Sequence, residues 1–210
     1  MSAKQEASLQ ALGKYLPEGT LDKVLPWLTD HKIHLTITRE RQTVLGDYRQ
    51  PDRHSGHRIS INGNLNKYAF LLTLLHEIAH MDTFLQFGSR VASHGKEWKK
   101  RYADILKQFT GRGYLPHDVE IAVGHYVKNP AASSCGDDNL FRVLKKYDPP
   151  VDGHCFVEDL AEGALFKTKD GRVFRRGMKI RKRYKCLDLT TKREYFFSPV
   201  YEVEKVKGAS

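Results

Sequence analysis

Cysteine is scarce in this 210-residue sequence. Only three occur, Cys135, Cys155 and Cys186, and no two of them form a Cys-x-x-Cys pair. A disulfide framework pairs an even number of cysteines, and a four-cysteine structural zinc site needs two such close pairs. Both kinds of site are therefore disfavoured, and we expect three reduced structural thiols.

Long hydrophobic runs are also missing. The longest, residues 69–75, is far shorter than the roughly 20 apolar residues that a membrane-spanning helix needs. Residues 1–18 mix Lys, Glu and Gln with isolated Leu, and no apolar core of a secretory signal follows a basic start. With 40% hydrophobic residues a folded core is expected. The sequence predicts a cytoplasmic protein without membrane association.

Acidic residues are few near the C-terminal end. Residues 165–210 hold 14 Lys and Arg against 5 Asp and Glu, whereas the other 164 residues hold 21 against 20. Such asymmetry indicates a polyanionic partner, nucleic acid first, but a merely solvated basic face is an equally good interpretation. Aromatic residues between these cations could stack on bases, although core packing is their commoner use. They are Phe166, Phe174, Tyr184, Tyr195, Phe196, Phe197 and Tyr201.

Hydrophobic periodicity predicts the elements of the first part of the chain. It indicates helices over residues 5–16 and 20–31, and strands over 33–38, 43–48 and 57–62. A polar turn separates the last two strands, so we expect them to form an antiparallel pair that leads into the next helix.

A long buried helix follows these strands. Asn64 or Asn66 can cap it, it extends to about Phe87, and apolar residues nearly surround it. Ser93 can cap a further helix over about 95–109, and two short helices are expected after that one. The short helices cover residues 116–126 and 138–146.

The pattern changes at residues 149–153, which read Pro-Pro-Val-Asp-Gly and indicate a linker. Short β-type runs follow, with Asp170-Gly171 as the strongest hairpin signal, a break at Gly177 and a turn at residues 190–192. Five short strands in about 45 residues predict a small barrel or curled sheet.

The fold class is therefore α+β, with a small antiparallel sheet in a helical first domain and a small C-terminal β-rich, barrel-like unit. The expected domains are residues 1–125, a helical and linker segment over 126–159, and a basic β-rich domain over 160–210.

Function is indicated most strongly by His76-Glu77-Ile78-Ala79-His80. Residues four apart lie on one face of an α-helix, so His76 and His80 can hold one metal ion from a single helix. Glu77 is the right group to accept a proton from a metal-activated water. Two histidines and a glutamate in an otherwise apolar helix are costly unless they serve a purpose, so a metal site is favoured over core histidines.

A catalytic zinc site needs a third protein ligand. The extended motif with a glycine and a further histidine after His80 is excluded, because Thr83 and Gln86 stand at those positions. His94 and Glu97 remain, and since they lie three apart on one helix face, spacing alone does not choose between them.

The segment His76–His80, together with His94-Gly95-Lys96-Glu97-Trp98, resembles the SprT-like family of zinc metallopeptidases, over roughly residues 20–125. Residues 45–48, Leu-Gly-Asp-Tyr, also look like the family's segment ahead of the metal helix. The resemblance implies a zincin-like metalloprotease domain, Zn²⁺ bound by His76, His80 and His94, and Glu77 as general base. It makes Glu97 a helix-surface residue, with a supporting role behind the ligands left open.

One feature departs from the family. Many SprT-like proteins carry a four-cysteine zinc ribbon after the protease domain, and this sequence has no Cys-x-x-Cys pair with which to build one. The basic segment from about Leu160 stands in its place. It could supply nucleic-acid binding, without sequence preference, or simply pack on the protease domain.

The other candidate residues carry weaker signals. His54 and His57 could line a substrate cleft, and Tyr48 or Tyr68 could in principle stabilise an oxyanion, although packing is the commoner role for tyrosines. Five more histidines lack metal spacing and are not expected to be ligands: His31, His34, His117, His125 and His154. The sequence thus predicts a zinc metallopeptidase acting on protein or peptide substrates. Its alternative is a zinc-containing, nucleic-acid-associated binding protein with little protease activity.

Overall fold

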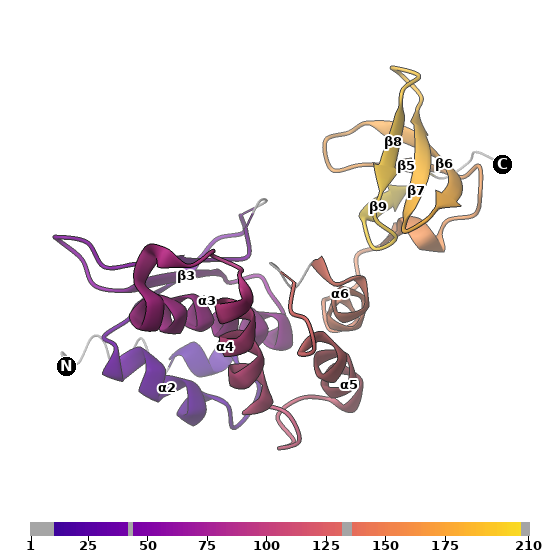
Figure 1. Ribbon diagram of the computed structural model, residues 1–210. Coiled ribbons are helices and arrows are strands. Elements are labelled where there is room, and N and C mark those ends of the chain that lie inside the picture. The colour runs from indigo at the N-terminus through magenta and orange to yellow at the C-terminus, as the bar shows by residue number, and fades with distance from the viewer. Residues whose placement is uncertain (1–10, 42–43, 132–135, 207–210) are drawn as a thin grey trace. The chain divides into compact units, whose positions relative to one another are not determined.

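The computed structural model describes residues 11–41, 44–131 and 136–206 (Figure 1). The chain divides into two compact units, Met1–Asp148 and Pro149–Ser210, and each has a hydrophobic core of its own. The α+β class is confirmed. Of the helix expected over residues 5–16, only the last part lies within the described residues, where Leu12–Tyr15 forms the short 3-10 helix η1.

The first unit contains a three-stranded sheet in the order β1-β3-β2, built from β1 (His34–Thr38), β2 (Gly46–Arg49) and β3 (Arg58–Asn62). The expected antiparallel pair is present, since β2 runs antiparallel to β3. The expectation of a wholly antiparallel sheet is wrong, because β1 runs parallel to β3. The central strand of the sheet is β3, and its residues Ile59 and Ile61 are buried. The chain therefore crosses from one side of β3 to the other between β1 and β2.

Helix α3 (Lys67–Phe87) packs against β2 and β3 (Figure 1). The side chain of Asn66 caps it by accepting hydrogen bonds from the N–H groups of Tyr68 (3.2 Å) and Ala69 (3.0 Å), so the predicted helix and its second cap candidate are confirmed. After the 3-10 turn η2 (Gly88–Arg90), helix α4 (Lys96–Lys107) packs on α3. The expected Ser93 cap is wrong: Gly95 holds the N-cap position, without a side-chain cap.

The described part of the first unit also contains α2 (Leu21–Asp30), α5 (His117–Tyr126) and α6 (Asp138–Lys145). Helix α6 buries Leu140 and Leu144 in the same core as α3 and α4, so the chain beyond residue 126 shares the core of this unit. Within the described residues, no helix has the length and apolar content required to cross a membrane.

The second unit is a curled, six-stranded antiparallel sheet in the order β4-β9-β5-β6-β7-β8. Its elements are β4 (His154–Phe156), the 3-10 turn η4 (Val157–Asp159), β5 (Leu165–Lys167), β6 (Val173–Ile180), β7 (Arg183–Asp188), β8 (Glu194–Phe197) and β9 (Glu202–Lys205). Phe166, Phe174, Tyr184 and Val203 form much of its core, which confirms that most of the tail aromatics serve packing. The curled sheet was predicted, although β4 was not.

The hairpins of this unit follow the sequence signals only in part. Asp170-Gly171 does separate β5 from β6, and Gly171 has the positive φ of 85° that its turn requires. The expected break at Gly177 is wrong, because β6 continues through it with a register shift between Arg176 and Lys179. The actual turn lies at residues 181–182, which carry neither Gly, Asn nor Pro and so gave no signal.

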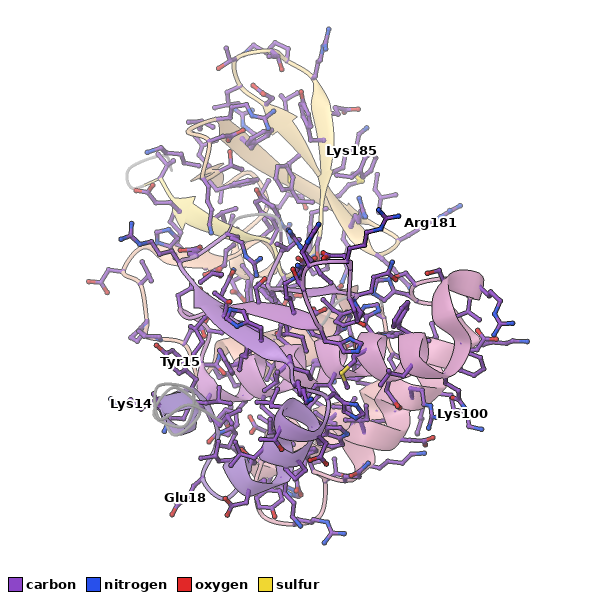
Figure 2. All side chains as sticks on the ribbon, turned by 90° about the vertical axis from the view of Figure 1, so that its left-hand side faces the viewer. Lys14, Tyr15, Glu18, Lys100, Arg181 and Lys185 are labelled. Atoms are coloured by element: carbon purple, nitrogen blue, oxygen red, sulfur yellow. The ribbon has the colours of Figure 1, made fainter. Side chains whose placement is uncertain are left out.

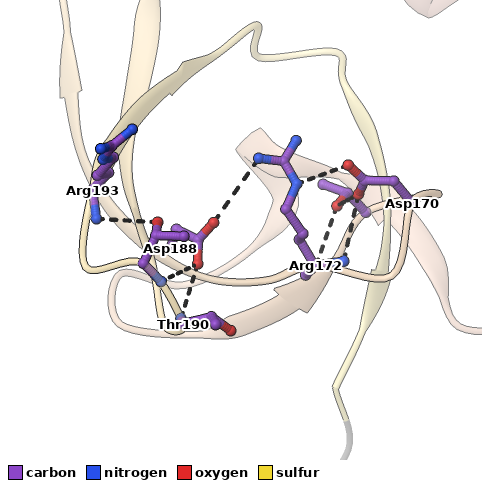
Figure 3. Close-up of polar contacts among 7 residues, drawn as sticks. Asp170, Arg172, Asp188, Thr190 and Arg193 are labelled. Atoms are coloured by element: carbon purple, nitrogen blue, oxygen red, sulfur yellow. Dashed lines mark hydrogen bonds and ion pairs between the residues drawn. The ribbon is translucent and has the colours of Figure 1, made fainter.

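A polar network ties the two turns at one end of this sheet together (Figure 3). Arg172 Nε lies 2.7 Å from Asp170 Oδ2, and its Nη1 lies 3.9 Å from the buried Asp188 Oδ2. Asp188 also accepts hydrogen bonds from the N–H groups of Thr190 (2.9 Å) and Thr191 (3.0 Å). The backbone N–H of Thr191, followed by that of Thr190, lowers the pKa of Asp188, and the Thr168 hydroxyl and Arg172 lower the pKa of Asp170 to about 2.

Candidate metal centre

Three histidines converge on one point between α3 and the start of α4. Their Nε2 atoms are separated by 3.1 Å (His76 to His80), 3.0 Å (His80 to His94) and 3.3 Å (His76 to His94). A tetrahedral zinc site with Zn–N distances of 2.0–2.1 Å separates its nitrogen ligands by about 3.3 Å. The three side chains could hold a metal ion, and their spacing fits zinc.

Helical geometry explains two of the three positions. His76 and His80 occupy successive turns of α3 on the face that meets α4, as i,i+4 residues do. His94 lies just before α4, where Gly95 N–H bonds the carbonyl of Ala92 (2.9 Å) in a tight turn. The loop between the helices thus brings a third imidazole to a pair that a single helix already aligns.

The surroundings keep these imidazoles neutral. Burial, together with the neighbouring histidines, lowers the pKa of His76 to about 3 and that of His80 to about 4. Burial also lowers the pKa of His94 below its usual range. A neutral imidazole offers the lone pair that a metal ion requires.

Trp98 packs against all three imidazoles. Its ring centroid lies 4.7 Å from that of His76, 5.2 Å from that of His80 and 4.7 Å from that of His94, and the side chain is fully buried. Tyr102 lies behind Trp98 and donates its hydroxyl to the carbonyl of Leu72 on α3 (2.9 Å). Trp98 and Tyr102 lie one turn apart on α4. The packing of Trp98 against the three imidazoles limits how far the histidine side chains can rotate.

Glu97, the alternative third ligand, is not part of this group. Its carboxylate lies 3.8 Å from Lys96 Nζ, and it is absent from the described set of side chains that could share one ion. In the folded structure His94, rather than Glu97, lies with His76 and His80, because the backbone before α4 turns His94 toward α3 while Glu97 stays in the first turn of α4.

Glu77 lies beside the histidines but faces β2. It is only 5% exposed, and a backbone hydrogen bond joins it to Tyr48. Burial, with the nearby Asp47 charge, raises its pKa to about 8, while Arg41 acts in the opposite direction. A Cβ on Gly46 would lie 2.6 Å from Glu77 Oε1, so only glycine allows β2 to approach this closely.

Among the described strands, β2 has a neighbour on one side only at this place. It is an edge strand of the sheet, and Asn62 N–H donates to the carbonyl of Leu45 (2.9 Å). Hydrogen-bonding direction alternates along an antiparallel strand, so the main-chain groups of Gly46 and Tyr48 point away from β3, toward the open edge. The Glu77 carboxylate accepts a hydrogen bond from the backbone of Tyr48, so this edge of β2 runs beside the carboxylate.

Arg41 holds this edge strand in place and was not singled out from the sequence. Its guanidinium donates to Asn62 Oδ1 (2.8 Å), Ser60 Oγ (2.9 Å), the Ser60 carbonyl (3.2 Å) and the Leu45 carbonyl (3.5 Å). It thereby joins β3 to the residue that precedes Gly46. An arginine in a loop has no periodic or spacing signal, so only the folded structure reveals this role.

The remaining candidates lie outside the group of three histidines. The Tyr48 hydroxyl is 2.8 Å from His57 Nδ1, and burial raises its pKa to about 12. His57 also packs on Phe84 of α3, which places this pair alongside β2, whereas Tyr68 packs on Tyr147. Among the described residues, none of the other histidines joins a possible metal group.

Comparison with known protein families gives a match over the part of the chain that contains the three histidines. A family model described as SprT-like family matches residues 18–125, just over half of the sequence. The matched range contains β1, β2, β3, the three histidines and Glu77. No curated protein and no solved structure was found to match.

Proposed function

Because the chain belongs to the SprT-like family, which implies a metallopeptidase-like domain, we propose that it is a zinc-dependent metallopeptidase that hydrolyses peptide bonds in protein or peptide substrates. One observation carries the proposal: three imidazole Nε2 atoms lie 3.0–3.3 Å apart beside a buried carboxylate. Three nitrogen ligands leave the fourth tetrahedral position free, as catalytic sites require.

The ligands in this proposal are His76, His80 and His94. Zinc, when bound, supplies a Lewis acid for the scissile carbonyl and lowers the pKa of water toward about 7. All other roles fall to side chains and main-chain groups of the chain itself. Trp98, which packs on all three imidazoles, would keep them oriented for the ion.

Glu77 is the proposed general base. It neighbours a ligand in sequence, yet its carboxylate is directed to β2 and is not one of the three grouped ligand atoms. In the proposed reaction it accepts a proton from the attacking water and delivers it to the leaving amine nitrogen, so the proton count balances as the C–N bond breaks.

The free edge of β2 is the proposed binding place for the substrate backbone. An extended peptide can add to an exposed strand through main-chain hydrogen bonds, which do not depend on its side chains. The groups of Gly46 and Tyr48 that point to the open edge would take part, and they lie next to Glu77. Such binding would bring a scissile bond to the base without a requirement for one sequence.

The test is cleavage of casein by the zinc-loaded full-length protein and by its Glu77→Gln variant, with and without DNA. Glutamine keeps the shape but cannot accept the proton, so we expect a loss of about 10²–10⁴-fold in rate with zinc content unchanged. Glu18→Gln, which alters an exposed carboxylate, is the matched control. Equal rates for wild type and Glu77→Gln would contradict the enzyme and favour a zinc-containing binding protein.

A further inference from the structure

The second unit carries a surface that its packing does not use. Ile180, Arg181, Lys182, Arg183 and Phe196 line an open hollow of about 630 Å³ at the turn between β6 and β7. We call these five residues the hairpin surface. Figure 2 labels Arg181 at this turn and Lys185 farther along β7.

Strand register places these side chains on the outer face of the sheet. Tyr184 and Cys186 of β7 are buried in the core, so the alternate residues Arg183 and Lys185 face outward. Ile180 pairs with Arg183, and Phe196 pairs with Lys185. Three neighbouring strands thus contribute to one continuous outward face.

Phe196 is the most exposed of the tail aromatics, ahead of Tyr201 at 41%. Its side chain is 52% exposed, whereas Phe166 and Phe174 are fully buried and stack at 5.6 Å in the core. Phe197, the next residue of β8, packs on Phe174 at 4.9 Å, so the core is already filled from β8. About half of Phe196 is thus exposed to solvent, and it is not among the residues of the core of this unit.

Positive charge is concentrated beside that ring. Residues 149–164 contain four acids and no Lys or Arg, so the whole unit has 14 basic against 9 acidic residues, a net of +5. Several cations are neutralised locally, as Lys185 is by Glu194 (2.8 Å). Arg181, Lys182 and Arg183 are consecutive and exposed, and none forms an ion pair with another described residue.

We propose that the hairpin surface binds single-stranded nucleic acid. Phosphates would lie on Arg181, Lys182 and Arg183, and one base would stack on the exposed face of Phe196. Unpaired bases stack on aromatic side chains whatever their identity, while a duplex keeps its base faces covered. The combination of an unpaired cation cluster and an exposed ring therefore favours a single strand over a duplex, and over an acidic peptide, which would gain only from the charges.

The charge contribution can be tested on the full-length protein with a fluorescently labelled 12-nucleotide oligothymidine, by anisotropy at 50 and 200 mM salt. Lys182→Gln with Arg183→Gln removes two phosphate contacts, which should make the negative slope of log K against log salt less steep by about 1.4 for a single strand. Lys169→Gln with Lys192→Asn removes the same charge at the opposite end of β6 and β7, and asparagine tolerates the positive φ of 59° at Lys192. This control should leave the slope unchanged.

The stacking contribution has its own variants. Phe196→Leu keeps an apolar side chain but loses the ring, and we expect a loss of affinity of about 5- to 150-fold. Phe196→Trp should retain binding or improve it. Circular dichroism on each variant confirms that the fold is intact.

Three outcomes would overturn the proposal. One is an equal loss of affinity in the charge control, which would make the effect a matter of net charge. Another is unchanged affinity of Phe196→Leu. The third is tighter binding of duplex DNA or of polyglutamate than of the oligothymidine, which would assign the surface to a duplex or to an acidic protein.

Discussion

The two units differ in which side chains have an unusual exposure to solvent. In the first, polar groups lie where apolar ones are expected: His76, Glu77 and His80 directly follow a stretch of α3, residues 69–75, that is wholly buried. In the second, Phe196 is exposed although apolar side chains of the same strand are packed. A buried polar group costs free energy unless it has a partner, and an exposed apolar group beside a cation cluster offers a partner apolar surface. The difference fits our two proposals, a small ion bound in the first unit and a large partner bound by the second.

The strongest test of this contrast is removal of the metal. Both tryptophans, Trp27 and Trp98, lie in the first unit, so tryptophan fluorescence reports on that unit alone. Zinc at about 1,000 times its Kd stabilises the folded state by about 4 kcal/mol, which corresponds to a fall in Tm on the order of 10 °C upon chelation.

The second unit provides the internal control for that experiment. Its strands contain tyrosine but no tryptophan, and hydrogen exchange of β6 and β7 reports their stability separately. Chelation should leave that exchange unchanged. An equal effect of chelation on the tryptophan signal and on β6 and β7 would show that the ion is not confined to the first unit.

Gly46→Ala should strongly lower activity although it changes neither the proposed ligands nor Glu77. The added methyl group would lie 2.6 Å from Glu77 Oε1 and 2.7 Å from Thr73 Cγ2, so the carboxylate or β2 must move. A misplacement of about 1 Å can lower the rate about 10²-fold, and zinc content should not change. Gly124→Ala in α5 is the control, because nothing lies within 4 Å of the added atom. Full activity of Gly46→Ala would separate β2 from the catalytic site.

Arg41→Ala should have a smaller effect through the same strand. The change removes the donors to Asn62, Ser60 and Leu45, which should lower the free energy of unfolding by about 2 kcal/mol. Because β2 is then held less firmly, kcat/KM should fall about 10-fold with zinc retained. Arg39→Ala, at an exposed position nearby, is the control. A loss of stability without any fall in kcat/KM would reduce Arg41 to a purely structural role.

The smallest effect is expected in the turn network of the second unit. The Thr168 hydroxyl and Arg172 lower the pKa of Asp170 to about 2, so the ionised carboxylate is favoured in the folded state. That stabilisation is present above the ordinary aspartate pKa of about 4 and is lost as the pH falls toward 2. Asp170→Asn should therefore speed hydrogen exchange of the β5–β6 turn slightly at pH 7 and not at pH 2. An equal difference at both pH values would contradict the charge-based account.

Local signals in the sequence predicted much of this structure. The SprT-like resemblance is confirmed, as are the capped helix that carries His76 and His80 and the Asp170-Gly171 hairpin. These features depend on spacing within one element or one turn. The zincin-like fold type, the zinc ion, the cytoplasmic location and the partners stay predictions.

Features that depend on contacts between distant segments could not be predicted. The parallel pairing of β1 with β3 and the approach of Gly46 to Glu77 join residues more than 20 positions apart. Gly177 was predicted wrongly for a different reason. In the sequence, a glycine at a bulge inside a strand looks the same as a glycine at the end of a strand. The preference for His94 over Glu97 as the proposed third ligand likewise depends on the backbone of the loop before α4.

That choice is tested most directly by the zinc content of three purified full-length proteins, measured by inductively coupled plasma mass spectrometry. The wild type should hold one zinc per chain, Glu97→Ala should hold the same amount, and His94→Ala should lose most of it, because two imidazoles alone bind zinc weakly compared with three. Near-native circular dichroism of His94→Ala would show that the fold survives. Zinc retained by His94→Ala but lost by Glu97→Ala would contradict the metal centre described above.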